Sequence, residues 1–93
     1  MATLFKENGE TLEVTPKNGE AFDVEELQTM VSGLVEIIHC TDGRLLVTDE
    51  EGKFKPHYKK NKKATEILHR LTLCHPLDYV VGNALLCEDE EID

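Results

Sequence analysis

The sequence predicts an α+β fold: a small, largely antiparallel sheet with two helices, in the order about ββ-α-βββ-α-β. Two longer segments carry apolar side chains at helical spacing. Shorter apolar runs are separated by turn dipeptides that are typical of hairpins, namely Asn8-Gly9, Asn18-Gly19 and Asp42-Gly43. We therefore expect one domain over residues 1–87, with both helices on one face of the sheet, and an acidic, frayed tail over residues 88–93.

The N-terminal quarter predicts a short meander. Asn8-Gly9 joins an apolar run at residues 3–5 to another at residues 11–14. Asn-Gly accepts positive φ at both central positions of a tight turn, so this pair predicts a hairpin. Asn18-Gly19 repeats the signal before residues 20–22, and the two segments resemble each other in sequence. We interpret them as two similar turns.

A helix is predicted over residues 24–32. Asp23 can cap its first turn, and Glu26, three residues on, completes a capping box. Apolar residues then recur at the spacing of one helical face. Gly33 suits the left-handed position that ends many helices.

The middle of the chain predicts a hairpin followed by a shorter strand. Residues 34–40 form a β-branched, nearly all-apolar run that is typical of a central strand. Asp42-Gly43 turns the chain into residues 44–48, which complete the clearest hairpin of the sequence. Residues 53–55 begin another strand, which Pro56 interrupts or confines to a sheet edge.

A second helix and a last strand complete the predicted fold. Asn61 is the expected N-cap of a helix over residues 62–70. Residues 79–87 predict the last strand, with a bulge or bend at Gly82-Asn83. We expect one hydrophobic core, built from Leu27, Met30, Val31, Leu34, Ile37, Leu45, Val47, Ile67, Leu68, Val81 and Leu85.

Charge is unevenly distributed along an acidic chain. The formal net charge is −9, which opposes direct binding to nucleic acid and to anionic membranes. Residues 53–78 nevertheless carry seven lysines and arginines against two acids. No run of apolar residues is long enough to predict a membrane span.

Cysteine usage favours a cytoplasmic location. Cys40, Cys74 and Cys87 are an odd set without CxxC spacing, so we expect free thiols in a reducing compartment. Together with the four histidines they match no zinc-ligand spacing, and we predict no metal and no cofactor. Nothing around Cys74 resembles a nucleophile turn, and no catalytic residue is predicted.

The stretch 53–63, here called the basic segment, is the candidate binding site. Lysines beside aromatics can hold phosphates and stack a base, and a helix that begins at Asn61 offers free backbone N–H groups to an anion. The competing interpretation is a solvated, charged edge that prevents aggregation. The candidate anion- or nucleotide-binding residues are Lys55, Tyr58, Lys59, Lys60, Asn61, Lys62 and Lys63.

Four short motifs follow one another along the chain: residues 27–36, Asp49–Lys53, Asn61–Thr65 and residues 78–84. The first contains Ser32-Gly33-Leu34, and the last ends in Gly82-Asn83-Ala84. In order and spacing, over roughly residues 11–87, they resemble a family of small domains of unknown function, numbered 3846. That family occurs mainly in bacteriophages, plasmids and other mobile elements. Ser32 stands where a second glycine is usual there, and residues 54–60 are more basic. The resemblance implies no reaction and no catalytic residue.

The sequence therefore predicts a non-enzymatic accessory protein of a phage or mobile element that binds a host or element protein. Its expected location is the host cytoplasm if a phage encodes it. The first alternative is a module that binds or sequesters a nucleotide or another small anion at the basic segment. The second is an acidic DNA mimic or counter-defence protein, which would need carboxylates on one face at near-phosphate spacing. Whether the chain forms a homodimer stays open.

Overall fold

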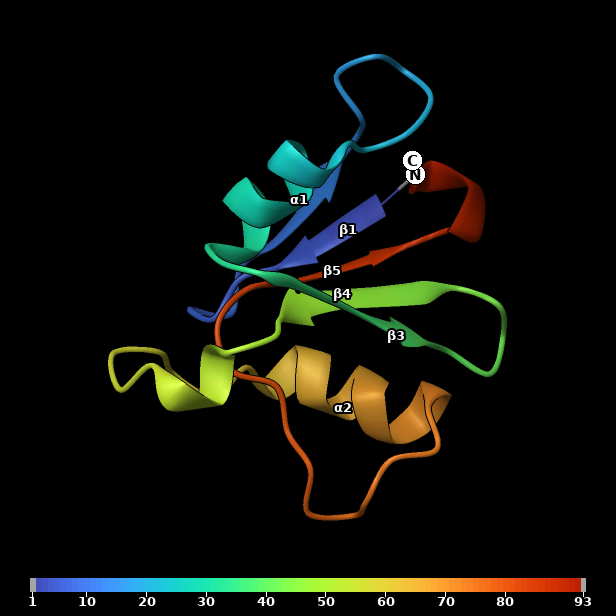
Figure 1. Ribbon diagram of the computed structural model, residues 1–93. Coiled ribbons are helices and arrows are strands. Elements are labelled where there is room, and N and C mark those ends of the chain that lie inside the picture. Colours follow the sequence, from blue (N-terminus) through green and yellow to red (C-terminus); the bar gives the residue numbers. More distant parts are fainter. Residues whose placement is uncertain (1, 93) are drawn as a thin grey trace.

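The computed structural model describes residues 2–92, which form a five-stranded antiparallel sheet with two α-helices (Figure 1). The strand order is β2-β1-β5-β4-β3. The α+β class and the antiparallel sheet are confirmed. The elements, in chain order, are β1 (Ala2–Phe5), β2 (Thr11–Val14), α1 (Val24–Val31), β3 (Val35–His39), β4 (Leu45–Asp49), α2 (Lys62–Leu71) and β5 (Ala84–Cys87), with single 3₁₀ turns at Gly52–Phe54 and Asp89–Glu91.

Local signals are confirmed where a few neighbouring residues decide the structure. β1 pairs with β2 across the Asn8-Gly9 turn, and β3 pairs with β4 across Asp42-Gly43. The side chain of Asp23 accepts a hydrogen bond from the Glu26 N–H, and the capping box at the start of α1 is complete. Asn61 caps α2 by accepting from the Ala64 N–H.

The helices lie on opposite faces of the sheet, contrary to the expectation of one face (Figure 1). Successive residues of a strand point to opposite faces, so β4 and β5 supply side chains to both helices. Leu27 and Val31 of α1 pack with Leu45, Val47 and Leu85 in one cluster, and Ala64 and Leu68 of α2 pack with Leu46, Ala84 and Leu86 in another. The predicted single core is thus wrong, because the sheet divides it in two.

The strand predicted to be central is an edge strand. β3 pairs only with β4, whereas β5 lies between β1 and β4 and occupies the centre of the sheet. All five positions of β4 are buried, but Leu34 and Ile37, both expected in the core, are exposed. Composition alone could not distinguish these two apolar strands, because the difference depends on where the last strand inserts.

One other predicted strand is wrong, and the last predicted strand, residues 79–87, is confirmed only over Ala84–Cys87. Residues 53–55 lie in the 3₁₀ turn Gly52–Phe54 and its end, not in a strand. β5 begins at Ala84, and of the predicted strand residues 79–83 Val81 alone makes an isolated bridge, to Lys60. Gly82, at φ 73°, bends the chain there, as the expected bend at Gly82-Asn83 predicts.

The acidic end of the chain is folded onto the domain over residues 88–92, where a frayed tail was expected. A 3₁₀ turn spans Asp89–Glu91, and Glu91 is buried. Ile92 makes a parallel bridge with Phe22, beyond the second predicted turn, and packs against the α1 cluster. The Asn18-Gly19 turn is present, but no strand follows it. Asp93 lies outside the described residues.

α1 ends in a left-handed residue, but that residue is Ser32, at φ 62°, and not Gly33. Gly33 is required for another reason: a Cβ there would collide with the carboxylate of Asp49 and the ammonium of Lys55. Among residues 2–92, Ser32 is the one non-glycine residue with a positive φ, so the left-handed position at the end of α1 is occupied by a residue that this conformation strains.

We expect Ser32→Gly to raise the free energy of unfolding by about 0.5–1 kcal/mol. A left-handed non-glycine residue costs roughly 1–2 kcal/mol, and the greater freedom of glycine in the unfolded chain offsets part of the gain. Gly33→Ala is the matched opposite and is expected to lower stability, because its methyl group meets Asp49. Chemical denaturation of both variants measures the two changes, and a Ser32→Gly variant less stable than the parent would contradict the strain.

Candidate binding surface

Asn61 is a buried structural residue that joins three parts of the chain. Its side chain is 2% exposed. The side-chain amide nitrogen donates to the carbonyl oxygens of Phe5 and Gly82, both at 2.8 Å, while its oxygen accepts from the Ala64 N–H at 3.1 Å. One residue thus connects β1, the bend before β5 and the start of α2. Because all of these groups are engaged with the protein, the Asn61 side chain has no donor left for a ligand.

The lysines around the start of α2 divide into engaged and free side chains. Lys63 donates to the carbonyl oxygen of Gly9 at 2.9 Å and to Thr11 Oγ1 at 3.2 Å. Lys60 lies 5.4 Å from the centre of the Tyr79 ring. The side chains of Lys59 and Lys62 have no ion-pair partner in the described part of the chain. Lys60, Lys62 and Lys63 border a hollow of about 270 Å³ that Glu7 also lines, whereas Lys59 does not line it.

Lys55 and Tyr58 are turned away from this hollow and hold the end of α1. The Lys55 ammonium lies 2.6 Å from Asp49 Oδ2 and 3.1 Å from the carbonyl oxygen of Ser32. Tyr58 donates to the same carbonyl oxygen at 3.0 Å. The structure therefore does not bring together all seven predicted site residues: two of them belong to a different contact.

Asp49 is the buried partner in that contact, with a side chain that is 0% exposed. Burial alone would raise the pKa of its carboxyl group. Hydrogen bonds from Lys55 and from the Glu51 N–H, together with the positive charge of Lys55, outweigh burial, and the pKa is lowered from its ordinary value of 3.8. Asp49 is therefore ionised at neutral pH and bound to the protein's own cation.

Lys53 is paired as well. Its ammonium donates to the Asp78 carboxylate and lies 4.7 Å from the centre of the Tyr79 ring. The Lys53 hydrogen bond lowers the pKa of Asp78 against the effect of burial, and the Tyr79 N–H, which donates at 2.8 Å, adds to it. Three of the lysines of the basic segment, Lys53, Lys55 and Lys63, are thus held by the protein itself.

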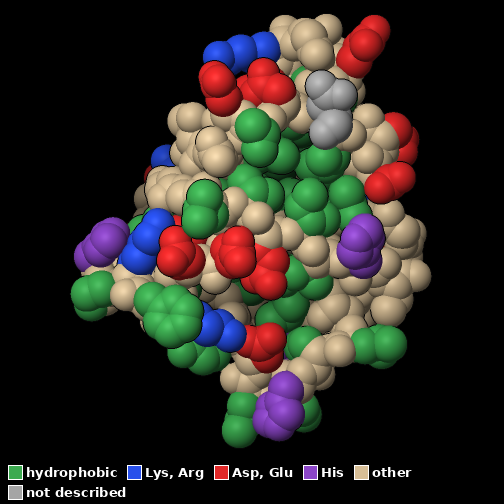
Figure 2. Space-filling view, in the orientation of Figure 1, with side chains coloured by type: hydrophobic (Ala, Val, Ile, Leu, Met, Phe, Trp, Pro, Cys, Tyr) green, Lys and Arg blue, Asp and Glu red, His purple; other side chains and the backbone are tan. Residues whose placement is uncertain are grey.

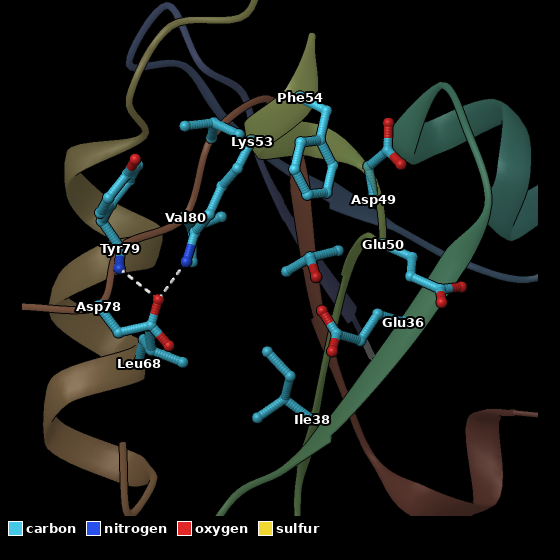
Figure 3. A pocket seen from close by; sticks show the side chains of 12 residues that line it. Glu36, Ile38, Asp49, Glu50, Lys53, Phe54, Leu68, Asp78, Tyr79 and Val80 are labelled. Atoms are coloured by element: carbon cyan, nitrogen blue, oxygen red, sulfur yellow. Dashed lines mark hydrogen bonds and ion pairs between the residues drawn. The ribbon is translucent and has the colours of Figure 1, made fainter. Parts of the chain in front are cut away.

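A groove separates the free edge of the sheet from α2 and the loop after it. It consists of two adjoining hollows of about 170 and 540 Å³ that share the lining residues Glu36, Ile38, Lys53, Leu68 and Asp78. Figure 3 shows Glu36 and Ile38 of β3 on one side, and Lys53, Asp78 and Tyr79 on the other. We call this feature the edge groove.

Large apolar side chains are exposed on the segments around the edge groove. Phe54 and Leu73, which border its two hollows, are 84% and 97% exposed, and Leu77 in the same loop is 80% exposed. Figure 2 shows hydrophobic side chains across the middle of this face, with Asp and Glu side chains among them. Ile37 of β3 is exposed as well.

Sequence reasoning missed the edge groove. Phe54 counts in the sequence only as one of the aromatics beside the lysines of the basic segment. Glu36 and Asp78 lie in motifs of the family resemblance, which imply no binding role, and Ile38 belongs only to a predicted strand. The groove exists because β3 is an edge strand and because the 3₁₀ turn Gly52–Phe54 places Phe54 beside it. Neither feature has a local signal in the sequence.

The cysteines carry no disulfide, and their surroundings disfavour reactive thiols. Cys40 and Cys87 are buried. Burial raises the pKa of the Cys40 thiol, an effect to which Asp42 adds, and raises that of Cys87 to about 12. Cys74 directs its sulfur at the carbonyl oxygen of Leu68. Between residues 2 and 92, no three His, Cys, Asp or Glu side chains gather as metal ligands, and no helix has the length and apolar character needed to cross a membrane.

Comparisons of the chain with family models, with curated proteins and with solved structures found no match. The resemblance to the family of unknown function therefore stays a prediction.

Asp49→Asn tests the buried ion pair through its pH dependence. The lowered pKa of Asp49 stabilises the fold above pH 3.8, and this contribution is lost as pH falls through the folded value. We expect the variant to lose about 1.5–3 kcal/mol at pH 7. Urea denaturation at pH 7 and at pH 3 gives the free energy of unfolding of both proteins. The difference in this free energy between parent and variant should be smaller at pH 3 than at pH 7. Equal differences at both pH values would show that the charge of Asp49 is not what stabilises the fold.

Asn61→Asp tests the three-way contact of Asn61. Aspartate retains the oxygen that caps α2 but replaces two donated hydrogen bonds with a carboxylate facing the carbonyl oxygens of Phe5 and Gly82. We expect a loss of at least about 3 kcal/mol in the free energy of unfolding. Asn18→Asp is the control, because Asn18 is exposed and its hydrogen bonds from the Glu20 and Ala21 N–H groups go to the side-chain oxygen that aspartate retains. If Asn61→Asp melts within a degree or two of the parent, the contact has no structural role.

Proposed function

We propose that this domain is a non-enzymatic accessory protein of a phage or mobile element that acts in the host cytoplasm and binds a host or element protein at the edge groove. The mobile-element origin rests on the sequence resemblance. The binding surface rests on one observation: Phe54, Leu73 and Leu77 are almost fully exposed on the segments around a groove in which sheet edge, cation and carboxylates meet.

The grouping of these side chains supports a protein partner. Single exposed apolar residues are ordinary on protein surfaces, whereas several large ones on the segments around one groove favour an interface. Aromatic side chains that enter a partner's pocket contribute much of the binding energy of such interfaces. Phe54, at 84% exposure, is suited to this role because little of its surface is used in folding.

The anion-binding alternative has weaker support. Three lysines of the basic segment are engaged, and all donors of the Asn61 side chain are used. The hollow at the start of α2 also contains the carboxylate of Glu7, which accepts from the Lys59 N–H at 2.8 Å. A fixed carboxylate beside the remaining lysines opposes a second anion.

Co-purification of the tagged protein from a host lysate, read by mass spectrometry of protein and small-molecule partners, tests the proposal. We expect a protein to be retained by the parent and lost from Phe54→Ser, because the substitution removes the exposed ring without opening the core. Melting of the variant should match that of the parent, since surface substitutions usually change stability by less than about 0.5 kcal/mol.

Val24→Ser is the matched control, because Val24 is also exposed but lies at the start of α1, on the opposite face of the sheet from α2. It should retain the partner. If both variants lose the co-purified protein partner, or if both retain it, binding at the edge groove is contradicted. A nucleotide retained in place of a protein would favour the anion-binding alternative. Capture of a DNA-binding enzyme that nucleic acid displaces would favour DNA mimicry.

A further inference from the structure

The outer edge of β3 offers unpaired backbone groups. The Glu50 N–H donates to the Leu34 carbonyl oxygen at 2.7 Å, and the Cys40 N–H donates to the Arg44 carbonyl oxygen at 2.9 Å. In an antiparallel pair the direction of the backbone groups alternates along the strand. Glu36 and Ile38 therefore point toward β4, whereas Val35, Ile37 and His39 point their N–H and C=O groups outward. No strand in the described chain pairs with them.

The space beside this edge is shaped for an added strand. The edge groove runs along the α2 side of β3, from Glu36 and Ile38 toward Cys40. Side chains of a strand paired with β3 would alternate, and every second one would face this groove. Phe54 and Leu73 border it and would cover those side chains. β3 contains neither the lysine nor the proline with which proteins commonly protect a free edge.

Charge at the edge groove selects a basic occupant. Glu36 and Glu50 line the groove, and neither has an ion-pair partner among residues 2–92. The one lysine that lines the groove, Lys53, is neutralised by Asp78, and Lys55 is paired with Asp49. The lining of the edge groove thus presents two free carboxylates and an ion-paired lysine, which favours lysine or arginine side chains on the partner.

A second copy of the chain fits this edge poorly. Each copy carries a formal net charge of −9. Pairing β3 with β3 of another copy would also bring the unpaired carboxylates of both edges together, which is unfavourable.

We propose that the partner binds by β-strand addition: an extended, lysine- or arginine-rich segment of another protein pairs with the backbone of Val35, Ile37 and His39 and places basic side chains against Glu36 and Glu50. This deepens the proposed function and rests on it. Main-chain hydrogen bonds supply affinity in such complexes, and the side chains facing the groove supply specificity.

The probe is a synthetic peptide of alternating lysine and valine, compared with a glutamate–valine counterpart by calorimetry at low and moderate salt. We expect the lysine peptide to bind at least about tenfold more tightly and to weaken as salt rises. Hydrogen exchange of the parent gives a second measurement that needs no variant. The peptide should slow exchange at the amides of Val35, Ile37 and His39, whereas those of Glu36 and Ile38 are already paired with β4.

Ile37→Pro removes one outward donor, which an edge strand tolerates because that N–H is not part of the ladder. We expect it to weaken peptide binding about tenfold. Glu13→Pro is the matched control, because Glu13 lies on β2 at the other edge, with its N–H directed away from β1 by the same alternation. Glu36→Gln with Glu50→Gln should weaken binding and reduce its salt dependence.

Equal affinity for both peptides, or protection outside β3, would overturn strand addition. So would a dimer that sediments as such and protects the same amides without peptide. If Ile37→Pro retains the co-purified partner while Phe54→Ser loses it, the proposed function stands and strand addition is wrong. If the lysine peptide binds at β3 but the parent captures no protein, β3 has the predicted chemistry and the proposed function fails.

Discussion

The buried carboxylate of Asp49 is the contact on which the arrangement of the binding surface depends. It accepts hydrogen bonds from Lys55 Nζ and from the Glu51 N–H, and Lys55 also donates to the carbonyl oxygen of Ser32. The end of β4, the end of α1 and the segment after the 3₁₀ turn are thereby joined at one point. A buried charge whose partner is removed is strongly destabilising. Separating these three parts would leave the Asp49 carboxylate without its partner, so it is energetically unfavourable. The turn that carries Lys53 and Phe54 is consequently held beside the edge of the sheet.

Asn61 likewise joins distant parts of the chain, near the C-terminal end of the basic segment. Its contacts with Phe5 and Gly82 lie 56 and 21 residues away in sequence, and they anchor the start of α2 to the centre of the sheet. The basic segment is thus a connection fixed at both ends. This explains why several lysines that resemble a ligand site in the sequence are engaged in the structure: a chain of charge −9 has more carboxylates and carbonyls to satisfy than cations with which to satisfy them. Lys59, between the two anchors, and Lys62, directly after Asn61, are exposed and have no ion-pair partner among residues 2–92.

The parts of the fold that could be predicted are those that neighbouring residues decide. The Asp23–Glu26 capping box, the Asn61 cap and the turns at Asn8-Gly9 and Asp42-Gly43 each depend on a few consecutive residues, and all are present. The side of the sheet on which each helix packs, the edge position of β3 and the pairing of Lys55 with Asp49 depend on long-range insertion of β5 and on tertiary contacts. Ile37 illustrates why sequence alone was insufficient. An apolar residue in an apolar strand predicts a core position whether the strand is central or at the edge of the sheet. The edge groove required both pieces of long-range information, so no motif could indicate it.

The position of β5 explains why an edge is open at all. β3 and β4 form a local hairpin, and β1 and β2 form another; the last strand joins them by pairing with β1 and β4. The inner strand of each hairpin is thereby buried, and the outer strand of each keeps a free edge. An open apolar edge such as β3 normally invites pairing between copies. Strong like charge opposes that pairing without closing the edge to other molecules, and at β3 the two unpaired glutamates concentrate this effect locally. The charge that keeps copies of the protein apart is therefore the same property that makes the edge selective for a partner of opposite charge.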